Sequence, residues 1–283
     1  MQSRESSART YCIIGDPIEH SLSPAMQNAA FAALGLNYTY IAFRVPQDEL
    51  SESVASLKAA NIPGFNVTVP LKVDIIKHLD ELDETAKMAA AVNTVNNVDG
   101  RLKGYNTDIE GFRRPFLNRH LSLEDLKVLL IGAGGAARAV VAALSTAKVA
   151  TVTIVNRDPA RAADLAAIGA KMGMRVKVAP MEDIKACSSG SDLIVNATTL
   201  GLHNEKSLLR ADDIKKGAIV YDLVYRPVVT DLIGNAKRAQ AVVIYGYEML
   251  LEQGALAFEI WTGLAAPREA MKKNLLGFFG EPM

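Results

Sequence analysis

The stretch Lys127–Arg138, KVLLIGAGGAAR, is the strongest indication of fold in this sequence. An apolar run stops at a glycine turn and continues into an alanine-rich helical pattern. The spacing fits G-x-G-x-x-A, in which the first glycine permits a tight turn and the second lets backbone approach a pyrophosphate. Phosphates held there lie on free N–H groups at a helix N-terminus. The stretch therefore predicts a nucleotide site, with an ordinary strand-turn-helix unit as the alternative; its residues are Gly132, Ala133, Gly134, Gly135 and Ala136.

A second buried-strand pattern, VATVTIV at 149–155, follows this helix and ends at three polar residues. A dinucleotide-binding unit reads the ribose at about this point. Neutral Asn156 is compatible with a ribose 2′-phosphate, and Arg157 with Arg161 can clamp that phosphate by bidentate hydrogen bonds. Because Asp158 precedes a proline, we expect it to cap a helix. Repulsion of the phosphate by Asp158, or its pairing with Arg161, is the alternative.

Composition limits the classes of protein that the sequence can encode. Its 283 residues are 49 % hydrophobic and 22 % charged, which predicts two globular domains. Lys+Arg and Asp+Glu both number 31, so no basic surplus indicates nucleic acid or an anionic membrane. Neither a metal-binding His/Cys spacing nor a bilayer-spanning apolar stretch occurs. We expect a soluble, cytoplasmic protein without a metal, and the polar residues 1–10 as a frayed terminus rather than a signal peptide.

Strand and helix patterns alternate along the whole chain, which predicts an α/β protein with mostly parallel sheets. Strands are expected at 11–15, 38–45, 63–70, 91–98, 101–104, 127–131, 150–155, 175–179, 192–196, 218–223 and 241–244. Helical patterns lie between most of them, and the final ones cover 246–263 and 267–276. Linkers near residues 118–125 and 245–246 divide the chain into two domains, namely 1–120 with 245–283, and 121–244.

Polar residues near strand ends in the first half are candidates for binding a ligand. Ser21 and Ser23 can both donate to a carboxylate, although helix capping is the simpler explanation of Ser23. Asn66 and Thr68 share one face of an expected strand. Lys72 follows at an expected helix start, where the helix dipole disfavours a cation. A solvated surface role is the plain alternative for this lysine.

Further polar residues lie where their types are unusual or where a ligand can approach. Asn93 and Asn96 fall inside a strand pattern that is normally poor in asparagine, and buried amides need partners. Asp108 begins a helix, where an acid is expected from the dipole alone. Thr198 belongs to a loop after a buried strand. That loop can bring backbone close to a nicotinamide, or it simply ends the strand.

Together these segments resemble the shikimate dehydrogenase family. The resemblance covers nearly the whole chain, from about Tyr11 to Phe279, and no single motif decides it. The resemblance is specific because several motifs occur in the family's order along the chain. The motifs are SLSP at 21–24, NVTVPLK at 66–72, AVNT at 91–94, GYNTD at 104–108, the glycine turn, NATTLG at 196–201 and MLLEQ at 249–253.

The resemblance implies a two-domain α/β fold, with a mostly parallel-sheet substrate domain and a Rossmann-type domain that binds NADP(H). It implies reversible reduction of 3-dehydroshikimate to shikimate in the biosynthesis of chorismate and aromatic amino acids. Lys72, paired with Asp108, is then the acid/base group. The residues implied for the substrate carboxylate are Ser21, Ser23, Thr68 and Tyr225, and those for the ring hydroxyls are Asn66, Asn93, Asp108 and Gln253. Those implied for the cofactor are the glycine turn, Asn156, Arg157, Arg161, Thr198, Leu223 and Gly246.

The implied chemistry suits these residue types, because hydride delivery to a ketone builds alkoxide character that an ammonium can stabilise and protonate. Two positions depart from the family. Tyr245 stands where members often carry Asp or Asn, and Asp158 where many NADP-dependent members carry Thr.

Two other functions stay open. The first is a quinate or dual-specificity dehydrogenase, with NAD as a second or alternative cofactor. The second is a non-catalytic dinucleotide-sensing relative, which needs neither Lys72 nor Asp108. Each of these functions has small molecules as partners rather than nucleic acid or membrane. For each, the protein is expected to be a monomer or a homodimer.

Overall fold

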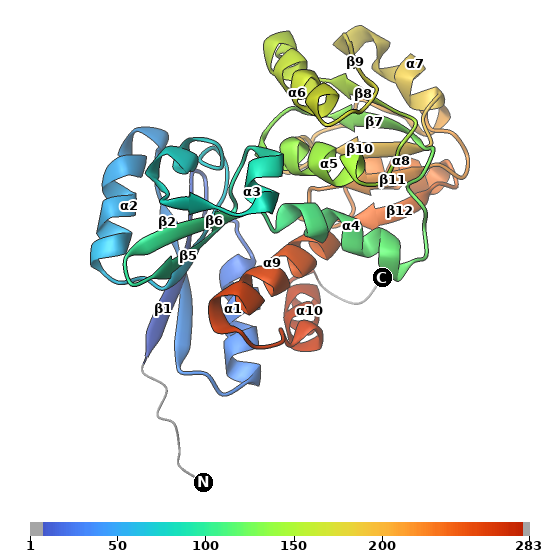
Figure 1. Cartoon of the computed structure of the whole chain (residues 1–283). Coiled ribbons are helices and arrows are strands. Elements are labelled where there is room, and N and C mark those ends of the chain that lie inside the picture. The colour runs from blue at the N-terminus through green and yellow to red at the C-terminus, as the bar shows by residue number, and fades with distance from the viewer. Residues whose placement is uncertain (1–7, 280–283) are drawn as a thin grey trace. The chain divides into compact units, whose positions relative to one another are not determined.

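The computed structural model describes residues 8–279, which divide into two compact units (Figure 1). The first unit ends at Thr107 and resumes at Leu251, and the second runs from Asp108 to Leu250. Residues 1–7 of the expected frayed terminus lie outside the described residues, whereas Arg9 already begins the first strand. Over residues 8–279, none of the helices has the length and apolar character needed to span a membrane.

The first unit is built on a mixed six-stranded sheet of order β2-β1-β3-β5-β6-β4. Its strands are β1 (Arg9–Gly15), β2 (Tyr38–Arg44), β3 (Gly64–Val67), β4 (Glu81–Leu82), β5 (Thr94–Val98) and β6 (Arg101–Tyr105). Strand β1 runs parallel to β2 and β3, whereas β5 runs antiparallel to β3 and β6. Asp99 and Gly100 connect β5 to β6 with φ of 51° and 80°, the left-handed pair that a tight hairpin requires.

Helices cover both faces of this sheet. Leu50, Val54 and Leu57 of α2 (Leu50–Ala59) share one helix face and belong to the same buried cluster as Cys12 of β1. The neighbouring Tyr11 points to the opposite face, because side chains alternate along a strand. Its ring lies among rings of α1 (Ser23–Ala33) and α9 (Gly246–Thr262). Helix α10 (Arg268–Gly277) contacts α1, and the short α3 (Glu84–Ala89) contacts β4 and β6.

The second unit has a six-stranded sheet whose strands all run parallel, in the order β12-β11-β10-β7-β8-β9. They are β7 (Lys127–Ile131), β8 (Thr151–Val155), β9 (Val176–Ala179), β10 (Leu193–Asn196), β11 (Ile219–Asp222) and β12 (Val242–Tyr245). This is the Rossmann order, in which two halves of three strands meet where the order reverses. Here that point lies between β7 and β10.

The helices of the second unit are α4 (Asp108–Asn118), α5 (Gly135–Ser145), α6 (Pro159–Lys171), α7 (Ile184–Ser189) and α8 (Asp231–Arg238). Leu129 of β7 belongs to a buried cluster with Ile184 of α7 and Leu232 of α8. Its neighbours Val128 and Leu130 are equally buried and point the other way. Strands buried on both faces explain the continuous apolar runs of this half of the sequence.

Two local expectations at predicted site residues are wrong. Lys72 does not begin a helix, because residues 69–73 form a turn before the short 3-10 helix at Asp74–His78. Its carbonyl accepts the Val92 N–H at 2.8 Å and is therefore taken by the neighbouring segment. Ser23 does not cap α1, since the N-cap position is Leu22 and no side chain makes the capping bond. Instead the Ser23 N–H donates to the Ser21 hydroxyl at 3.3 Å.

Candidate active site

A buried chain of polar side chains crosses the sheet of the first unit. Asn66 of β3 lies opposite Thr94 of β5, and its amide donates to the Thr94 hydroxyl at 3.0 Å. The Tyr40 hydroxyl donates to the Asn66 carbonyl oxygen at 2.6 Å. All three residues are at most 4 % exposed. The amide of Asn66 is thus held in one orientation from both sides.

Asn93 extends this network to a distant part of the chain. Its amide N–H₂ donates to the Thr107 hydroxyl at 2.9 Å and to the Gln253 side-chain oxygen at 3.4 Å. Its carbonyl oxygen accepts the Thr107 backbone N–H at 2.8 Å. The structure thus brings together Asn66, Asn93 and Gln253, three of the residues predicted to bind substrate. Tyr40, Thr94 and Thr107 were not predicted, although both threonines stand inside motifs that carry the family resemblance.

The predicted carboxylate-binding hydroxyls follow the ends of two adjacent parallel strands, β1 and β3. Ser21 and Thr68 are partly buried and Ser23 is buried. The segments after β1 and β3 touch, since a β-carbon on Gly15 would lie 2.4 Å from the Thr68 methyl group. Only glycine at position 15 permits this approach. The ends of parallel strands are where such folds bind ligands.

Lys72 and Asp108 belong to different units. Lys72 lies partly buried in the turn after β3 of the first unit. Asp108 is the first residue of α4 and of the second unit, and it is 4 % exposed. Tyr225, predicted to help bind substrate, lies in the loop after β11 of the second unit and is partly buried.

The glycine turn after β7 has the geometry that its sequence predicts. Gly132 adopts φ +110°, and a β-carbon there would lie 2.9 Å from the Ala197 carbonyl oxygen. The turn is therefore packed directly against the loop after β10. Gly134 is the N-cap residue of α5, and a β-carbon there would have no atom within 4 Å. The helix N-terminus thus opens onto free space in which an anion can sit.

The end of β8 carries the residues expected to read the ribose. Asp158 caps α6, since its carboxylate accepts the N–H groups of Ala160 and Arg161 at 3.0 and 3.3 Å, which confirms the predicted cap. The same carboxylate lies 3.6 Å from the Arg161 guanidinium, with both side chains exposed, so the alternative ion pair is also present. Asn156 donates to the Asp158 carbonyl, and Arg157 is exposed.

A buried carboxylate that was not predicted from the sequence joins the loops after β10 and β11. Asp222 ends β11, is fully buried, and accepts hydrogen bonds from Asn196, Val224 and Thr230. Burial raises the pKa of Asp222 to about 6, although these three donors act to lower it. Thr198, a predicted cofactor residue, donates to the Asn196 side chain at 2.6 Å. The available signal was an acid at the carboxyl end of an expected buried strand.

The loop after β11 also packs against the start of α9. A β-carbon on Gly246 would lie 2.6 Å from the carbonyl oxygens of both Leu223 and Val224. Leu223 and Gly246, two predicted cofactor residues, are therefore in contact. The neighbouring Tyr245 stacks on Tyr247 with ring centroids 5.8 Å apart.

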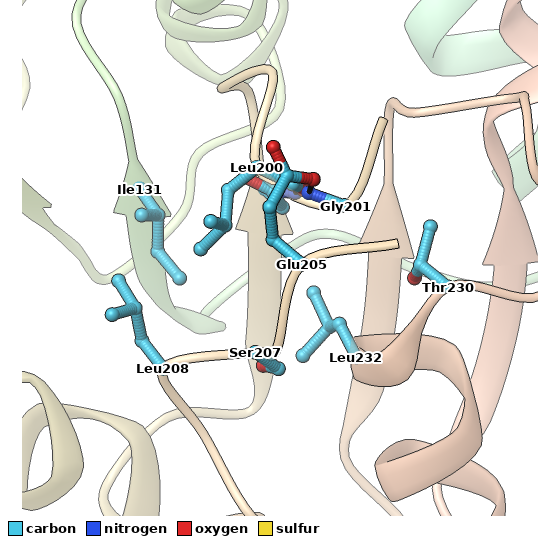
Figure 2. Close-up of a pocket in the computed structure, with 9 residues that line it drawn as sticks. Ile131, Leu200, Gly201, Glu205, Ser207, Leu208, Thr230 and Leu232 are labelled. Carbon is cyan, nitrogen blue, oxygen red and sulfur yellow. Dashed lines mark hydrogen bonds between the residues drawn. The ribbon is translucent and has the colours of Figure 1, made fainter. Parts of the chain in front are cut away.

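Beyond Thr198, the loop after β10 folds over a small pocket of the second unit (Figure 2). The Glu205 carboxylate points back onto this loop and accepts the N–H groups of Gly201 and His203 at 3.0 and 2.8 Å. Hydrogen bonds from its own backbone N–H and from His203 and Gly201 lower the pKa of Glu205. These hydrogen bonds connect Glu205 to Gly201 and His203 within the tip of the loop.

The described part of the chain contains neither a cysteine pair nor a metal-binding cluster. Cys12 is buried and Cys187 is partly buried, and both are free thiols. Over residues 8–279, no group of three or more His, Cys, Asp or Glu side chains is arranged to hold a metal ion.

Comparison with known families matches three consecutive parts of the chain. Residues 13–95 match the shikimate dehydrogenase substrate binding domain, residues 117–234 match shikimate / quinate 5-dehydrogenase, and residues 246–276 match the shikimate 5'-dehydrogenase C-terminal domain. The chain belongs to the shikimate dehydrogenase family. It shares 46 % identity with a shikimate dehydrogenase (NADP(+)) of Nitrosopumilus maritimus, over 96 % of this chain and 99 % of that relative.

Two solved structures of family members bear on the ligands. Shikimate 5-dehydrogenase from Thermus thermophilus, in complex with NADP(H) and shikimate, is 37 % identical, with a TM-score of 0.84. The match covers 95 % of this chain and 99 % of that one. Quinate dehydrogenase from Corynebacterium glutamicum, in complex with NAD, is 28 % identical, with a TM-score of 0.87 over 96 % and 100 % of the two chains. Both alternatives for substrate and cofactor thus occur on this fold.

Proposed function

We propose that the chain is an NADP-dependent shikimate dehydrogenase, which catalyses the reversible reduction of 3-dehydroshikimate to shikimate in the biosynthesis of aromatic amino acids. The observation that carries this function is the 46 % identity, over nearly the full length of both chains, with a shikimate dehydrogenase (NADP(+)). The described geometry agrees, since one unit holds a buried polar network and the other a Rossmann sheet with an open glycine turn.

The second unit fits a dinucleotide at the carboxyl ends of its strands. The space in front of Gly134 and the free N–H groups of the first turn of α5 suit a pyrophosphate. Arg157 and Arg161 would hold the 2′-phosphate of NADP. Thr198, Leu223 and Gly246 would bind the nicotinamide half; when bound, the cofactor supplies the hydride.

The first unit would bind and orient 3-dehydroshikimate or shikimate. The hydroxyl groups of Ser21, Ser23 and Thr68 would donate hydrogen bonds to its carboxylate, and Tyr225 would contribute to the same binding. Asn66, Asn93 and Gln253 carry amide groups that can both donate to and accept from ring hydroxyls. Because the network fixes these amides beforehand, little ordering is required when substrate binds.

Lys72 and Asp108 would perform the proton chemistry. Hydride addition turns a carbonyl oxygen into a developing alkoxide, which a positioned ammonium stabilises and protonates. Lys72 would be that group, and Asp108 would orient it and contribute to binding a ring hydroxyl. A dinucleotide sensor requires neither residue, which favours an enzyme over the non-catalytic alternative.

We also propose a cellular compartment and an oligomeric state for the enzyme. We place it in the cytoplasm, because two free thiols suit a reducing compartment. We propose a monomer or a homodimer as the active form. Light scattering coupled to size-exclusion chromatography distinguishes these two states, and a larger assembly would contradict both.

The test is the reduction of 3-dehydroshikimate by the purified protein. We expect NADPH absorbance to fall in proportion to substrate added, with shikimate as the product identified by chromatography. Lys72→Ala protein is the matched control and should consume NADPH at least about a hundredfold more slowly. NADPH binding without turnover by the wild-type protein would support the sensing alternative.

Quinate dehydrogenase remains the second candidate, because a quinate dehydrogenase bound to NAD has the same fold over 96 % of this chain. Quinate carries one more ring hydroxyl than shikimate, so the site must provide it with room and a partner. A protein that oxidises quinate with NAD faster than shikimate with NADP would have this second function.

A further inference from the structure

The Asp222 carboxylate accepts three hydrogen bonds at the carboxyl end of β11. One carboxylate oxygen accepts the Asn196 amide at 2.8 Å and the Val224 backbone N–H at 3.1 Å. The other accepts the Thr230 hydroxyl at 2.6 Å. The side chain is fully buried. Three donors, one from the end of β10 and two from the loop after β11, thus converge on one group.

The first donor connects Asp222 to the loop after β10. Asn196 ends β10, and its carbonyl oxygen accepts both the backbone N–H and the hydroxyl of Thr198, at 3.1 and 2.6 Å. The Thr198 hydroxyl in turn accepts the Leu200 N–H at 3.1 Å. Asp222 therefore fixes the orientation of the amide that organises this loop.

The other two donors fix the loop after β11 at both of its ends. Val224 lies at the beginning, where its carbonyl oxygen and that of Leu223 press against Gly246. Thr230 lies at the end, where its hydroxyl also accepts the Ile233 N–H at 3.2 Å and caps α8. One carboxylate thus joins two loops, which also meet where Gly201 packs against the Thr230 side chain.

These loops belong to β10 and β11, in the second half of the Rossmann sheet. In this fold one half of the sheet receives each half of the dinucleotide. The glycine turn and the arginines belong to β7 and β8, which leaves the β10–β12 half for the nicotinamide. We propose, on the basis of the function proposed above, that Asp222 is a positioning residue that holds the nicotinamide-binding loops in place.

A carboxylate is required because every group that faces it is a donor in this arrangement. An amide at position 222 would direct N–H groups at one of these donors, whichever way it turned. The Thr230 hydroxyl donates its proton to Asp222 while it accepts the Ile233 N–H, and an amide N–H₂ group turned towards it would deprive that proton of its acceptor. Burial raises the pKa of this carboxyl, so retaining it costs folding stability. Such a cost is typical of a group kept for function.

The test compares two ligands that share the adenosine half of the cofactor. NADPH contains the nicotinamide, whereas 2′,5′-ADP carries only the adenosine and its 2′-phosphate. For Asp222→Asn and for Thr230→Val, we expect the Kd of NADPH to rise about tenfold or more, as for loss of a hydrogen bond to a charged group. The Kd of 2′,5′-ADP should stay within about twofold, and kcat should fall because the hydride donor is misplaced.

Two controls separate positioning from stability. Thr230→Ser keeps the hydroxyl and should restore the wild-type Kd of NADPH. Asn235→Ala removes another buried amide of α8, which bonds to the Leu209 carbonyl and to Asp231 and Arg238 of its own helix, and should lower Tm without changing either Kd. Equal weakening of both ligands, or wild-type NADPH affinity in Asp222→Asn and Thr230→Val, would overturn the positioning role. Wild-type protein that binds neither ligand would instead refute the proposed function.

Discussion

Replacing Gly134 by alanine separates cofactor binding from folding at the glycine turn. The backbone there has φ −88° and ψ −168°, which an alanine adopts freely, and a methyl group would meet no atom within 4 Å. Alanine is a poorer N-cap than glycine by about 0.5–1 kcal/mol, but it lowers the entropy of the unfolded chain by a similar amount. The free energy of unfolding should therefore stay within about 1 kcal/mol of the wild-type value.

Binding should respond much more strongly, because the methyl group occupies the space proposed for the pyrophosphate. Losing one hydrogen bond to a charged group removes about 1.5–3 kcal/mol, which raises the Kd of NADPH about ten- to a hundredfold. Isothermal titration calorimetry gives the Kd, and urea unfolding gives the stability. The shikimate Kd, measured without cofactor, should not change.

The matched control is Gly234→Ala in the middle of α8, where a methyl group also meets no atom within 4 Å. It should stabilise the protein by about 0.5–1 kcal/mol through helix propensity and leave the Kd of NADPH unchanged. A Gly134→Ala protein that binds NADPH as tightly as the wild type would refute the placement of the pyrophosphate at α5.

The remaining predictions concern the proton transfer, the cofactor preference and the buried acid. Lys72→Ala should lower kcat about a hundredfold or more with a smaller effect on shikimate affinity, and Asp108→Asn combined with it should add little, because the two act as a unit; additive losses in stopped-flow rates would contradict this. Neutral residues at both Arg157 and Arg161 should abolish most of the preference for NADP in kcat/KM and spare NAD-linked activity, and an unchanged ratio would exclude the arginine clamp. The Asp222 carboxyl binds its proton more tightly folded than unfolded, since burial raises its pKa from 3.8 to about 6. Its ionisation should therefore reduce the free energy of unfolding, by up to about 3 kcal/mol as the pH rises from about 4 to about 7. Urea unfolding of Asp222→Asn should lack this decrease, and parallel pH profiles for the two proteins would contradict it.

The second unit could be predicted from the sequence because each of its strands is an apolar run that parallel pairing buries. A continuous apolar run such as Val128–Ile131 indicates a strand that is buried on both faces. A glycine turn directly after such a strand can adopt only a few backbone conformations. All six expected strands of this unit occur within two residues of their predicted ends. The Asp158 cap was equally predictable, since it depends only on local backbone N–H groups.

The errors arose where a contact distant in sequence decides the local structure. The helix expected at Lys72 fails because Val92, on another segment, takes the Lys72 carbonyl. The strand expected at 91–98 begins only at Thr94. The preceding Asn93 directs its side chain to Thr107 and Gln253, which are distant in sequence. Local propensity contains no information about such partners.

Asp222 was missed for a related reason. A single acid at the end of an apolar strand is usually solvated, and nothing in the neighbouring sequence indicates that three hydrogen-bond donors surround it. Two of them, Asn196 and Thr230, are separated from it by 26 and 8 residues. Only the parallel pairing of β10 with β11 brings Asn196 beside Asp222. The sequence therefore indicates the site in outline, whereas tertiary structure supplies the groups that hold it.

The proposed substrate and cofactor are tested together by kcat/KM of the wild-type enzyme for shikimate and for quinate, each measured with NADP and with NAD at sub-saturating cofactor. We predict that shikimate with NADP has the highest value of the four, by about tenfold or more over each of the other three pairs. The extra hydroxyl of quinate requires room and a partner in the site, and NAD lacks the phosphate that the two arginines would hold. A highest value for quinate, or for either substrate with NAD, would contradict the proposed function.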